Sequence, residues 1–326
     1  MARTKKQANP FDPEHYRLES ISNQTRAINR RIWLMSRSAV NWWETDIATA
    51  RQARAQGLDG HTPVKKSPRA RMITIPGPSG DLALCVIAPR RARGVYLHIH
   101  GGAWVLGASD QQDDALEEFV RRCGMASVSV EYGLAPEHKF PAALDDCECA
   151  ALWLLENCEA EFGTRKLVIG GESAGANLSV GTLLRLRKQL GRTGFVAANL
   201  VCGAFDLGMT PSQRILGAEL EQLVEMEETV RAYLPTGVDC RDPEVSPLYA
   251  DLRGLPPALI TVGTRDALLD DSLFLYVRWI AAGNEAQLAV YPGGAHGFTS
   301  FPFQLARDAN HRIYSFVKKA IAGERG

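Results

Sequence analysis

The pattern of apolar positions along the chain changes near residue 70. Residues 1–65 are rich in polar residues, and their apolar residues recur at helical spacing, at Ile32, Met35, Ala39, Trp43 and Ile47. This spacing predicts one or two amphipathic helices, which Gly57 and Gly60 end. From residue 70 onward, short apolar runs alternate with longer helical patterns, so a different organisation begins there.

The second region opens with two runs that predict an antiparallel hairpin, at residues 71–77 and 81–89 around the turn GPSG. Further strands are predicted at residues 94–100, 125–132, 166–171, 195–206, 256–266 and 286–294. Helices are predicted between and after them, at residues 110–124, 140–158, 174–191, 270–283 and 307–323. This alternation predicts a mostly parallel sheet covered on both faces, an α/β fold. Residues 207–240 break the alternation with a helical pattern, which indicates an insertion.

Composition excludes several classes of function. Lys plus Arg and Asp plus Glu both number 37, so no basic excess favours a nucleic-acid or anionic-membrane partner. The charged N-terminal stretch lacks the apolar core of a Sec signal peptide, and no run approaches the roughly 18 apolar residues of a transmembrane helix. The seven cysteines lie scattered in apolar segments, which predicts reduced thiols in a cytoplasmic protein. Cys147 and Cys149 have no matching Cys or His pair, so we expect no metal site.

Four of the predicted strands end in residues that carry chemistry. One strand runs into Gly101 and Gly102, and a second runs into a G-x-S-x-G sequence around Ser173. A third strand is followed by Asp266 and a fourth by His296. Sites in open α/β sheets form beyond the carboxyl ends of the strands, so we expect these residues to meet. The order Ser, Asp, His along the chain is that of the α/β-hydrolases.

The serine, the histidine and the aspartate fit the roles of a catalytic triad. A serine between glycines can stand on a sharp strand-to-helix turn, because the glycines have no Cβ to clash across that turn. Ser173 would need a base to act as a nucleophile, and His296 can be that base near neutral pH. Asp266 would hold the tautomer of His296 and stabilise its imidazolium form.

The glycine-rich loop fits the second requirement of acyl transfer, which is the stabilisation of an oxyanion. Glycines allow the main chain to approach a substrate carbonyl closely. The candidate donors are the backbone N–H groups of Gly101, Gly102 and Ala174. We expect His100 to anchor this loop through hydrogen bonds rather than to transfer protons.

Each of these residues alone would also fit a structural role, and their joint occurrence favours catalysis. Asp270 and Asp271 are alternative acids, but they suit the cap or first turn of the helix that follows, whereas Asp266 lies at the strand end. The glycines around Ser173 are not followed by the Lys-Ser/Thr of a phosphate-binding loop. Of the seven histidines, His296 alone follows a strand late in the chain.

These motifs together resemble the hormone-sensitive lipase-like family of α/β-hydrolases, the bacterial family IV esterases. The resemblance covers about residues 70–322 and rests on the stretches HIHGGAW, VEYGLAPEHKFPAALDDC, GGESAGANLS, SPLYADLRGLPPALITVGTRDALLDDS and YPGGAHGF. It implies an α/β-hydrolase fold, with the triad and the oxyanion donors at the residues named above and no cofactor. It also implies a helical cap, so residues 1–65 would form an N-terminal cap segment, 66–326 the catalytic domain, and 207–240 a second cap insertion.

The sequence departs from the family pattern at two positions. Ala103 stands where the family has a third glycine, and we expect activity to persist with a less flexible loop. Glu172 stands where the family has Asp, and we expect it to orient the turn or a neighbouring loop. Glu137 and His138 are expected to brace the turn and the following helix rather than to touch substrate.

The resemblance implies hydrolysis of short-to-medium-chain carboxylic esters through an acyl-enzyme. Two alternatives stay open at this point. The same triad could act on amides or on a specialised acylated substrate, or the fold could bind a ligand without catalysis. The expected partner is a small-molecule ester, and a homodimer through the outer helix or edge strand is a family-level expectation.

Overall fold

The computed structural model describes residues 9–37, 41–58 and 65–324, and within them eight strands form one sheet. The strand order is β1-β2-β4-β3-β5-β6-β7-β8. The strands are β1 (Arg71–Gly77), β2 (Gly80–Ile87), β3 (Val95–Ile99), β4 (Ala126–Val130), β5 (Leu167–Glu172), β6 (Ala197–Val201), β7 (Ala258–Arg265) and β8 (Ala286–Ala295). The pairs β1–β2 and β2–β4 are antiparallel, and the other neighbours are parallel. The predicted hairpin and the mostly parallel sheet are therefore confirmed.

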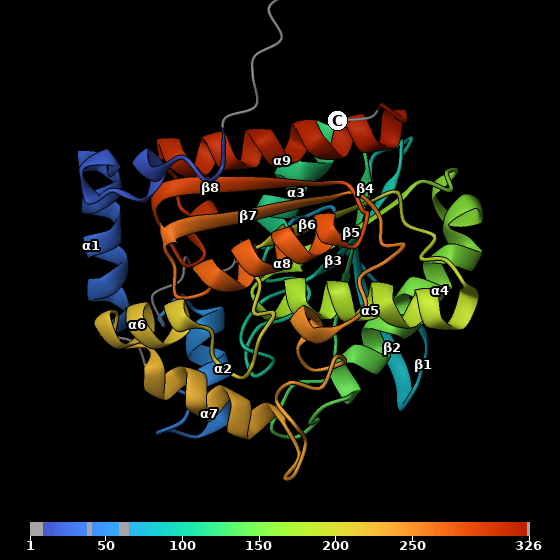
Figure 1. Ribbon diagram of the computed structural model, residues 1–326. Helices are drawn as coiled ribbons and strands as arrows, with labels where there is room; N and C mark the ends of the chain where they lie inside the picture. Colours follow the sequence, from blue (N-terminus) through green and yellow to red (C-terminus); the bar gives the residue numbers. More distant parts are fainter. Residues whose placement is uncertain (1–8, 38–40, 59–64, 325–326) are drawn as a thin grey trace, which may run out of the picture.

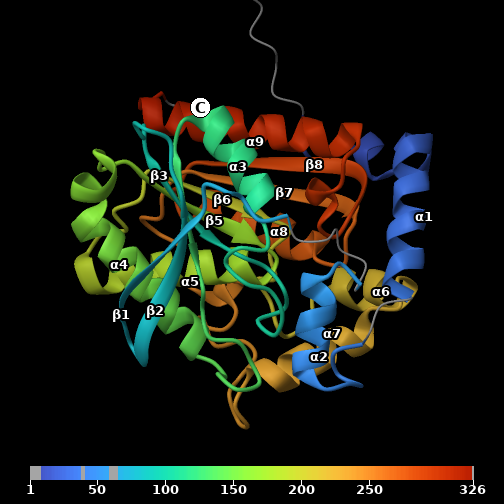
Figure 2. The same ribbon diagram turned by 180° about the vertical axis from the view of Figure 1, so that it is seen from behind.

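Helices cover both faces of this sheet (Figures 1 and 2). They are α1 (Asn23–Arg37), α2 (Ile47–Ala55), α3 (Asp113–Cys123), α4 (Ala142–Phe162), α5 (Ala174–Leu190), α6 (Pro211–Glu219), α7 (Leu223–Tyr233), α8 (Leu269–Ala281) and α9 (Gln304–Ala322). Helices α4, α5 and α8 pack on one face, and α3 and α9 pack on the other. Because of this double cover, every residue of β3 and β4 is buried, including the two serines of β4.

The N-terminal segment forms two helices, as expected, but the turn between them includes one residue of the predicted stripe. Trp43 lies in this turn. Helix α2 begins only after Asp46, which caps it by accepting a hydrogen bond from the Thr49 N–H at 3.0 Å. Helix α2 ends before Gly57, which has a φ of 70°. Two residues of the prediction, Ala39 and Gly60, lie outside the described residues, as does the start of the charged N-terminal stretch.

Residues 207–240, which the sequence predicts to be a helical insertion, contain two helices, α6 and α7. Pro211 begins α6 at a position where its missing N–H costs nothing. Glu221, with a φ of 59°, lies between the two helices and turns the chain. Figures 1 and 2 place α2, α6 and α7 together at one end of the molecule. Among the helices of the described residues, none is both long and apolar enough to cross a membrane.

Candidate active site

Ser173 stands on a sharp turn between β5 and α5. Its backbone has φ 55° and ψ −120°, a conformation that costs a non-glycine residue roughly 1–3 kcal/mol. The flanking glycines are needed for close packing: a Cβ on Gly171 or Gly175 would lie 2.0 Å or 1.9 Å from the carbonyl oxygen of Ile99. The predicted turn is therefore present, and β3 supports it from behind.

The structure brings the three predicted triad residues into one hydrogen-bonded chain. The Nε2 atom of His296 lies 3.1 Å from the Oγ atom of Ser173. The Nδ1 atom of His296 lies 3.0 Å and 3.1 Å from the two carboxylate oxygens of Asp266. Asp266 is fully buried and also accepts a hydrogen bond from the Leu268 N–H at 2.9 Å. A carboxylate can only accept, so Nδ1 carries a proton, and in the neutral imidazole Nε2 is free to accept one from the serine.

The electrostatics around His296 favour its charged form. Burial alone would lower the pKa of His296, but the adjacent Asp266 carboxylate and the Cys202 thiol raise this pKa well above its usual value. The side-chain ligand atoms of Cys202, Asp266 and His296 lie within 4.8 Å of one another. This thiol was not predicted as a site residue, although it directly follows β6 and could have been found as a further strand-end residue.

The predicted oxyanion loop lies against the serine turn. Gly102 has a φ of 121°, and its carbonyl accepts hydrogen bonds from the N–H groups of Val105 and Leu106, at 3.0 Å and 2.8 Å. A Cβ on Gly101 would lie 2.8 Å from the carbonyl oxygen of Glu172, so this loop and the turn are in close contact. The third predicted donor, the Ala174 N–H, belongs to the first residue of α5, where helix N–H groups have no intrahelical partner.

His100 anchors this loop, as expected. Its Nδ1 atom donates a hydrogen bond to the carbonyl oxygen of Gly101 at 2.8 Å, and its ring stacks on Tyr132 with centroids 4.2 Å apart. Burial lowers the pKa of His100 to about 3, so the imidazole stays neutral at ordinary pH. A neutral, stacked and hydrogen-bonded histidine suits a structural role.

Two non-glycine residues of the oxyanion loop have a left-handed backbone. Ala103 has a φ of 56° and Trp104 a φ of 58°. The departure from a third glycine therefore falls at a position where glycine would be less strained. The Trp104 ring stacks on Tyr233 of α7, with centroids 4.4 Å apart and planes 12° from parallel, and its carbonyl accepts from the Ala135 N–H at 2.8 Å.

Arg51 of α2 reaches the same loop and was not predicted from the sequence. Its Nε donates to the carbonyl oxygen of Val105 at 3.0 Å, and one Nη donates to that of Ala135 at 2.9 Å. The guanidinium also pairs with the Glu137 carboxylate at 2.9 Å and 2.7 Å, and this pairing lowers the pKa of Glu137. Glu137 was expected to brace the serine turn and the following helix. That expectation is wrong, because its carboxylate binds Arg51 of α2.

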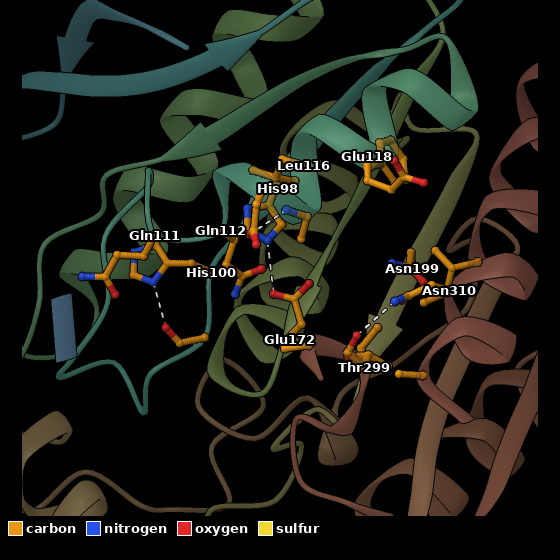
Figure 3. Close-up of a pocket in the computed structure, with 18 of the residues that line it drawn as sticks. His98, His100, Gln111, Gln112, Leu116, Glu118, Glu172, Asn199, Thr299 and Asn310 are labelled. Carbon is orange, nitrogen blue, oxygen red and sulfur yellow. Dashed lines mark hydrogen bonds and ion pairs between the residues drawn. The ribbon is translucent and has the colours of Figure 1, made fainter. Parts of the chain in front are cut away.

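Glu172 faces away from the triad. Its carboxylate lies 3.1 Å from the Nε2 atom of His98 (Figure 3). The Nδ1 atom of His98 lies 2.9 Å from the Ser129 hydroxyl. These side chains join β5, β3 and β4 next to the turn that carries Ser173. Glu172 lines a cavity of about 360 Å³ that does not include Ser173 or His296. The expectation that Glu172 orients neighbouring structure agrees with these contacts.

The two rival acids serve the structure around α6. Asp270 and Asp271 both lie in the first turn of α8, as predicted. Asp271 is fully buried and accepts four hydrogen bonds, from the backbone of Phe205 and Asp206 and the side chains of Thr210 and Gln213. Burial raises the pKa of Asp271 to about 7. The Asp270 carboxylate accepts from the Ser212 N–H at 2.8 Å, so neither acid contacts His296.

A second cavity opens onto the triad itself, with a volume of about 140 Å³. Its floor includes Ser173 and His296, and its walls come from the oxyanion loop, the chain after β6, and α6 and α7. The wall residues that are apolar or contain sulfur are Ala103, Trp104, Ala204, Leu207, Met209, Met226, Val230, Ala267 and Leu268. The site can therefore hold an apolar group beside Ser173.

Comparison with known proteins identifies the family of this chain. The sequence profile of the alpha/beta hydrolase fold matches residues 96–300. An esterase of Acinetobacter venetianus is 30% identical over 262 residues, covering 78% of this chain and 84% of the esterase. The carboxylesterase NlhH of Mycobacterium tuberculosis is 31% identical, covering 70% and 74%. A hyperthermophilic esterase from Pyrobaculum calidifontis superposes with a TM-score of 0.80 at 29% identity, covering 92% and 99%. The chain therefore belongs to the α/β-hydrolase superfamily, in its hormone-sensitive lipase-like family of esterases.

Proposed function

We propose that this protein hydrolyses carboxylic esters with Ser173 as the nucleophile, His296 as the base and Asp266 as the orienting acid. The observation that carries the proposal is the continuous chain of hydrogen bonds from the serine through the imidazole to a buried carboxylate. The names of the relatives, which are esterases and carboxylesterases, support the ester as the substrate class. An intact triad also favours catalysis over ligand binding alone.

The reaction proceeds in two halves. His296 takes the proton of Ser173 as the hydroxyl attacks the ester carbonyl, and the carbonyl oxygen becomes an oxyanion. The backbone N–H groups of Gly101, Gly102 and Ala174 hold this oxyanion. His296 then protonates the leaving alcohol. Water, activated by the same imidazole, attacks the acyl-enzyme and releases the acid and free serine.

The size of the triad cavity supports short acyl chains. A cavity of roughly 150 Å³ accommodates benzene, which has six heavy atoms. The triad cavity, of about 140 Å³, therefore accepts an acyl group of about that size. Because α6 and α7 supply part of its wall, these helices act as a cap, and α2 contributes through Arg51.

The test of this mechanism uses a Ser173→Ala variant and a fluorophosphonate probe. We expect the wild-type protein to hydrolyse p-nitrophenyl butyrate and to be labelled at Ser173, and the variant to do neither. Turnover that survives in Ser173→Ala would contradict the mechanism. Because alanine removes only a hydroxyl, the variant should fold like the wild type, and circular dichroism checks this.

Two further expectations belong to this proposal. A homodimer is supported by Phe274, Val277 and Ile280, which are exposed on α8 beside the edge strand β8. Light scattering after size-exclusion chromatography measures the mass directly.

The cytoplasmic location stays a prediction. All seven cysteines are free thiols, which is consistent with a reducing compartment.

A further inference from the structure

The cavity beside Glu172 is larger than the triad cavity, with a volume of about 360 Å³ (Figure 3). Its walls come from β3, β5 and β6, from α3 and α9, and from the loops that precede these two helices. Small-molecule sites have volumes of about 300–1,000 Å³, so a ligand of that class fits here. Neither Ser173 nor His296 lines this cavity, and the acyl group proposed above therefore does not occupy it.

Two buried acceptors on the sheet side of this cavity have no hydrogen-bond partner among the described residues. They are the Nε2 atom of His100 and the Oδ1 atom of Asn199, whose residues are 2% and 3% exposed. Nε2 is an acceptor because Nδ1 donates to the carbonyl oxygen of Gly101 and the imidazole is neutral. A buried acceptor without a donor is unfavourable, so these atoms favour a ligand that carries O–H or N–H groups.

Two glutamine side chains in the loop before α3 also line the cavity. Gln111 and Gln112 are half-buried, and neither side-chain amide forms a hydrogen bond with another described residue. Each amide offers two donors and an acceptor. The cavity thus presents acceptors from the sheet, and both donors and acceptors from this loop.

The charged side chains of the lining carry both signs. They are Arg54, Asp114, Glu118, Glu172 and Arg307. The Glu172 carboxylate lies beside His98, and Glu118 pairs with Arg121 and Arg122. A lining of mixed sign favours neither an anion nor a cation, whereas the acceptors and amides named above are neutral.

A neutral molecule with several hydroxyl groups matches this set of partners. A hydroxyl both donates and accepts, so it can bond to the two buried acceptors and to the glutamine amides. Leu116, Phe119 and Phe301 add apolar surface for the C–H groups of a ring. We propose that this cavity binds a polyhydroxylated molecule, a sugar or a cyclic polyol.

The bound molecule would lie beside the segments that carry the catalytic groups. Gly101, Glu172 and Thr299 all line the cavity, and they belong to the oxyanion loop, the serine turn and the loop after His296. A Cβ at Gly101 would lie 3.4 Å from the Cβ of Ser173. The polyol is therefore either the alcohol part of the ester or a free sugar next to the oxyanion loop. Binding itself does not depend on the proposed esterase function, whereas the first of these sources does.

Saturation-transfer difference NMR on the wild-type protein tests the site directly. The probes are D-glucose, D-xylose and myo-inositol, and we expect saturable binding of at least one of them. Cyclohexanol, which has a ring of six atoms and a single hydroxyl, is the matched ligand control. It should bind at least about tenfold more weakly, because it forms fewer hydrogen bonds.

Variants of the lining locate the binding. Gln111→Leu and Gln112→Leu remove amides that have no described protein partner, and each should weaken binding about fivefold through the lost hydrogen bonds. Asn199→Leu removes a buried acceptor and should weaken binding as well, with thermal unfolding measured to check its fold. Gln189→Leu, an exposed position on α5 outside the cavity, is the matched control and should bind like the wild type.

Hydrolysis kinetics identify the source of the polyol. We expect kcat/KM for 6-O-butyryl-D-glucose to exceed that for cyclohexylmethyl butyrate at least about tenfold, and Gln112→Leu to reduce this ratio. That result assigns the cavity to the alcohol part of the substrate. A ratio near one, with the free probes still bound, assigns it to a free sugar instead.

Absence of saturable binding for all three probes, together with a ratio near one, would overturn the proposal, and water would then satisfy the two acceptors. Binding or a ratio that is unchanged in Gln111→Leu, Gln112→Leu and Asn199→Leu would also overturn it. Absence of turnover for every ester, with probe binding intact, would instead contradict the esterase function and leave this site in place.

Discussion

Replacing Arg51 with methionine should reduce catalysis although Arg51 does not touch the triad. The guanidinium donates to the carbonyl oxygens of Val105 and Ala135, which belong to the oxyanion loop and to the loop packed against it. Methionine keeps much of the aliphatic stem and removes both donors. The loop then has to maintain the left-handed backbone of Ala103 and Trp104 without these bonds.

The magnitude follows from these contacts. A hydrogen bond from a charged donor contributes about 1.5–3 kcal/mol, and each strained backbone costs about 1–3 kcal/mol. If the loop conformation that holds the oxyanion becomes less favourable by about 2 kcal/mol, kcat/KM decreases roughly 30-fold. The assay is steady-state hydrolysis of p-nitrophenyl butyrate, with urea unfolding measured in parallel to separate activity from global stability.

A second substitution tests whether strain is the cause. Ala103→Gly removes the Cβ that disfavours a φ of 56°, so it should restore part of the activity of Arg51→Met, about fivefold for 1 kcal/mol. Glu137→Gln is the control for the ion pair: it leaves the two carbonyl contacts in place and should cost less than threefold. Wild-type activity in Arg51→Met, or an Ala103→Gly effect of the same size in both backgrounds, would refute the reasoning.

Three other properties follow from the site. Asp266 raises the pKa of His296, and only the neutral imidazole accepts the serine proton, so kcat/KM should rise with pH and reach its plateau above neutral pH. Asp266→Asn should move this rise to lower pH and reduce the rate by about 10⁴. A p-nitrophenyl ester series should peak at six acyl carbons or fewer, and Met226→Ala should shift the optimum to longer chains; an optimum at long chains in the wild type would indicate a lipase. Glu172→Ala should lower the melting temperature by removing the bond to His98, whereas Glu172→Gln should retain most of it; equal losses would show that charge rather than the hydrogen bond matters.

The sequence predicted those parts of the molecule that have a local signal. The strands, the turn at Ser173 and the loop at Gly101 follow from apolar runs and glycine positions within a few residues, and the family motifs assign the chemistry. Cys202 was missed although it directly follows β6, whereas Arg51 was missed because its partners lie elsewhere in the chain. Arg51 contacts Val105, 54 residues away, and no spacing rule reports such a contact. The boundary between α6 and α7 depends on Glu221, whose conformation its residue type does not suggest.

The contact between the oxyanion loop and the serine turn is visible only in three dimensions, and a substitution at Gly101 tests it. A Cβ at Gly101 would lie 2.8 Å from the carbonyl oxygen of Glu172 and 3.4 Å from the Cβ of Ser173, so alanine there must push the oxyanion loop away from the nucleophile. We expect Gly101→Ala to lower kcat by 10² or more, the effect of losing one oxyanion donor.

The matched control for this substitution is Gly163→Ala. A Cβ at Gly163 meets nothing within 4 Å, so the change should cost stability through its φ of 70° and leave kcat unchanged. If Gly101→Ala retained wild-type kcat, the loop would not need contact with the serine turn to hold the oxyanion. A loss confined to Gly101→Ala would instead mean that the loop and the serine turn act as one unit, in which the backbone at the end of β5 sets the distance between nucleophile and donors.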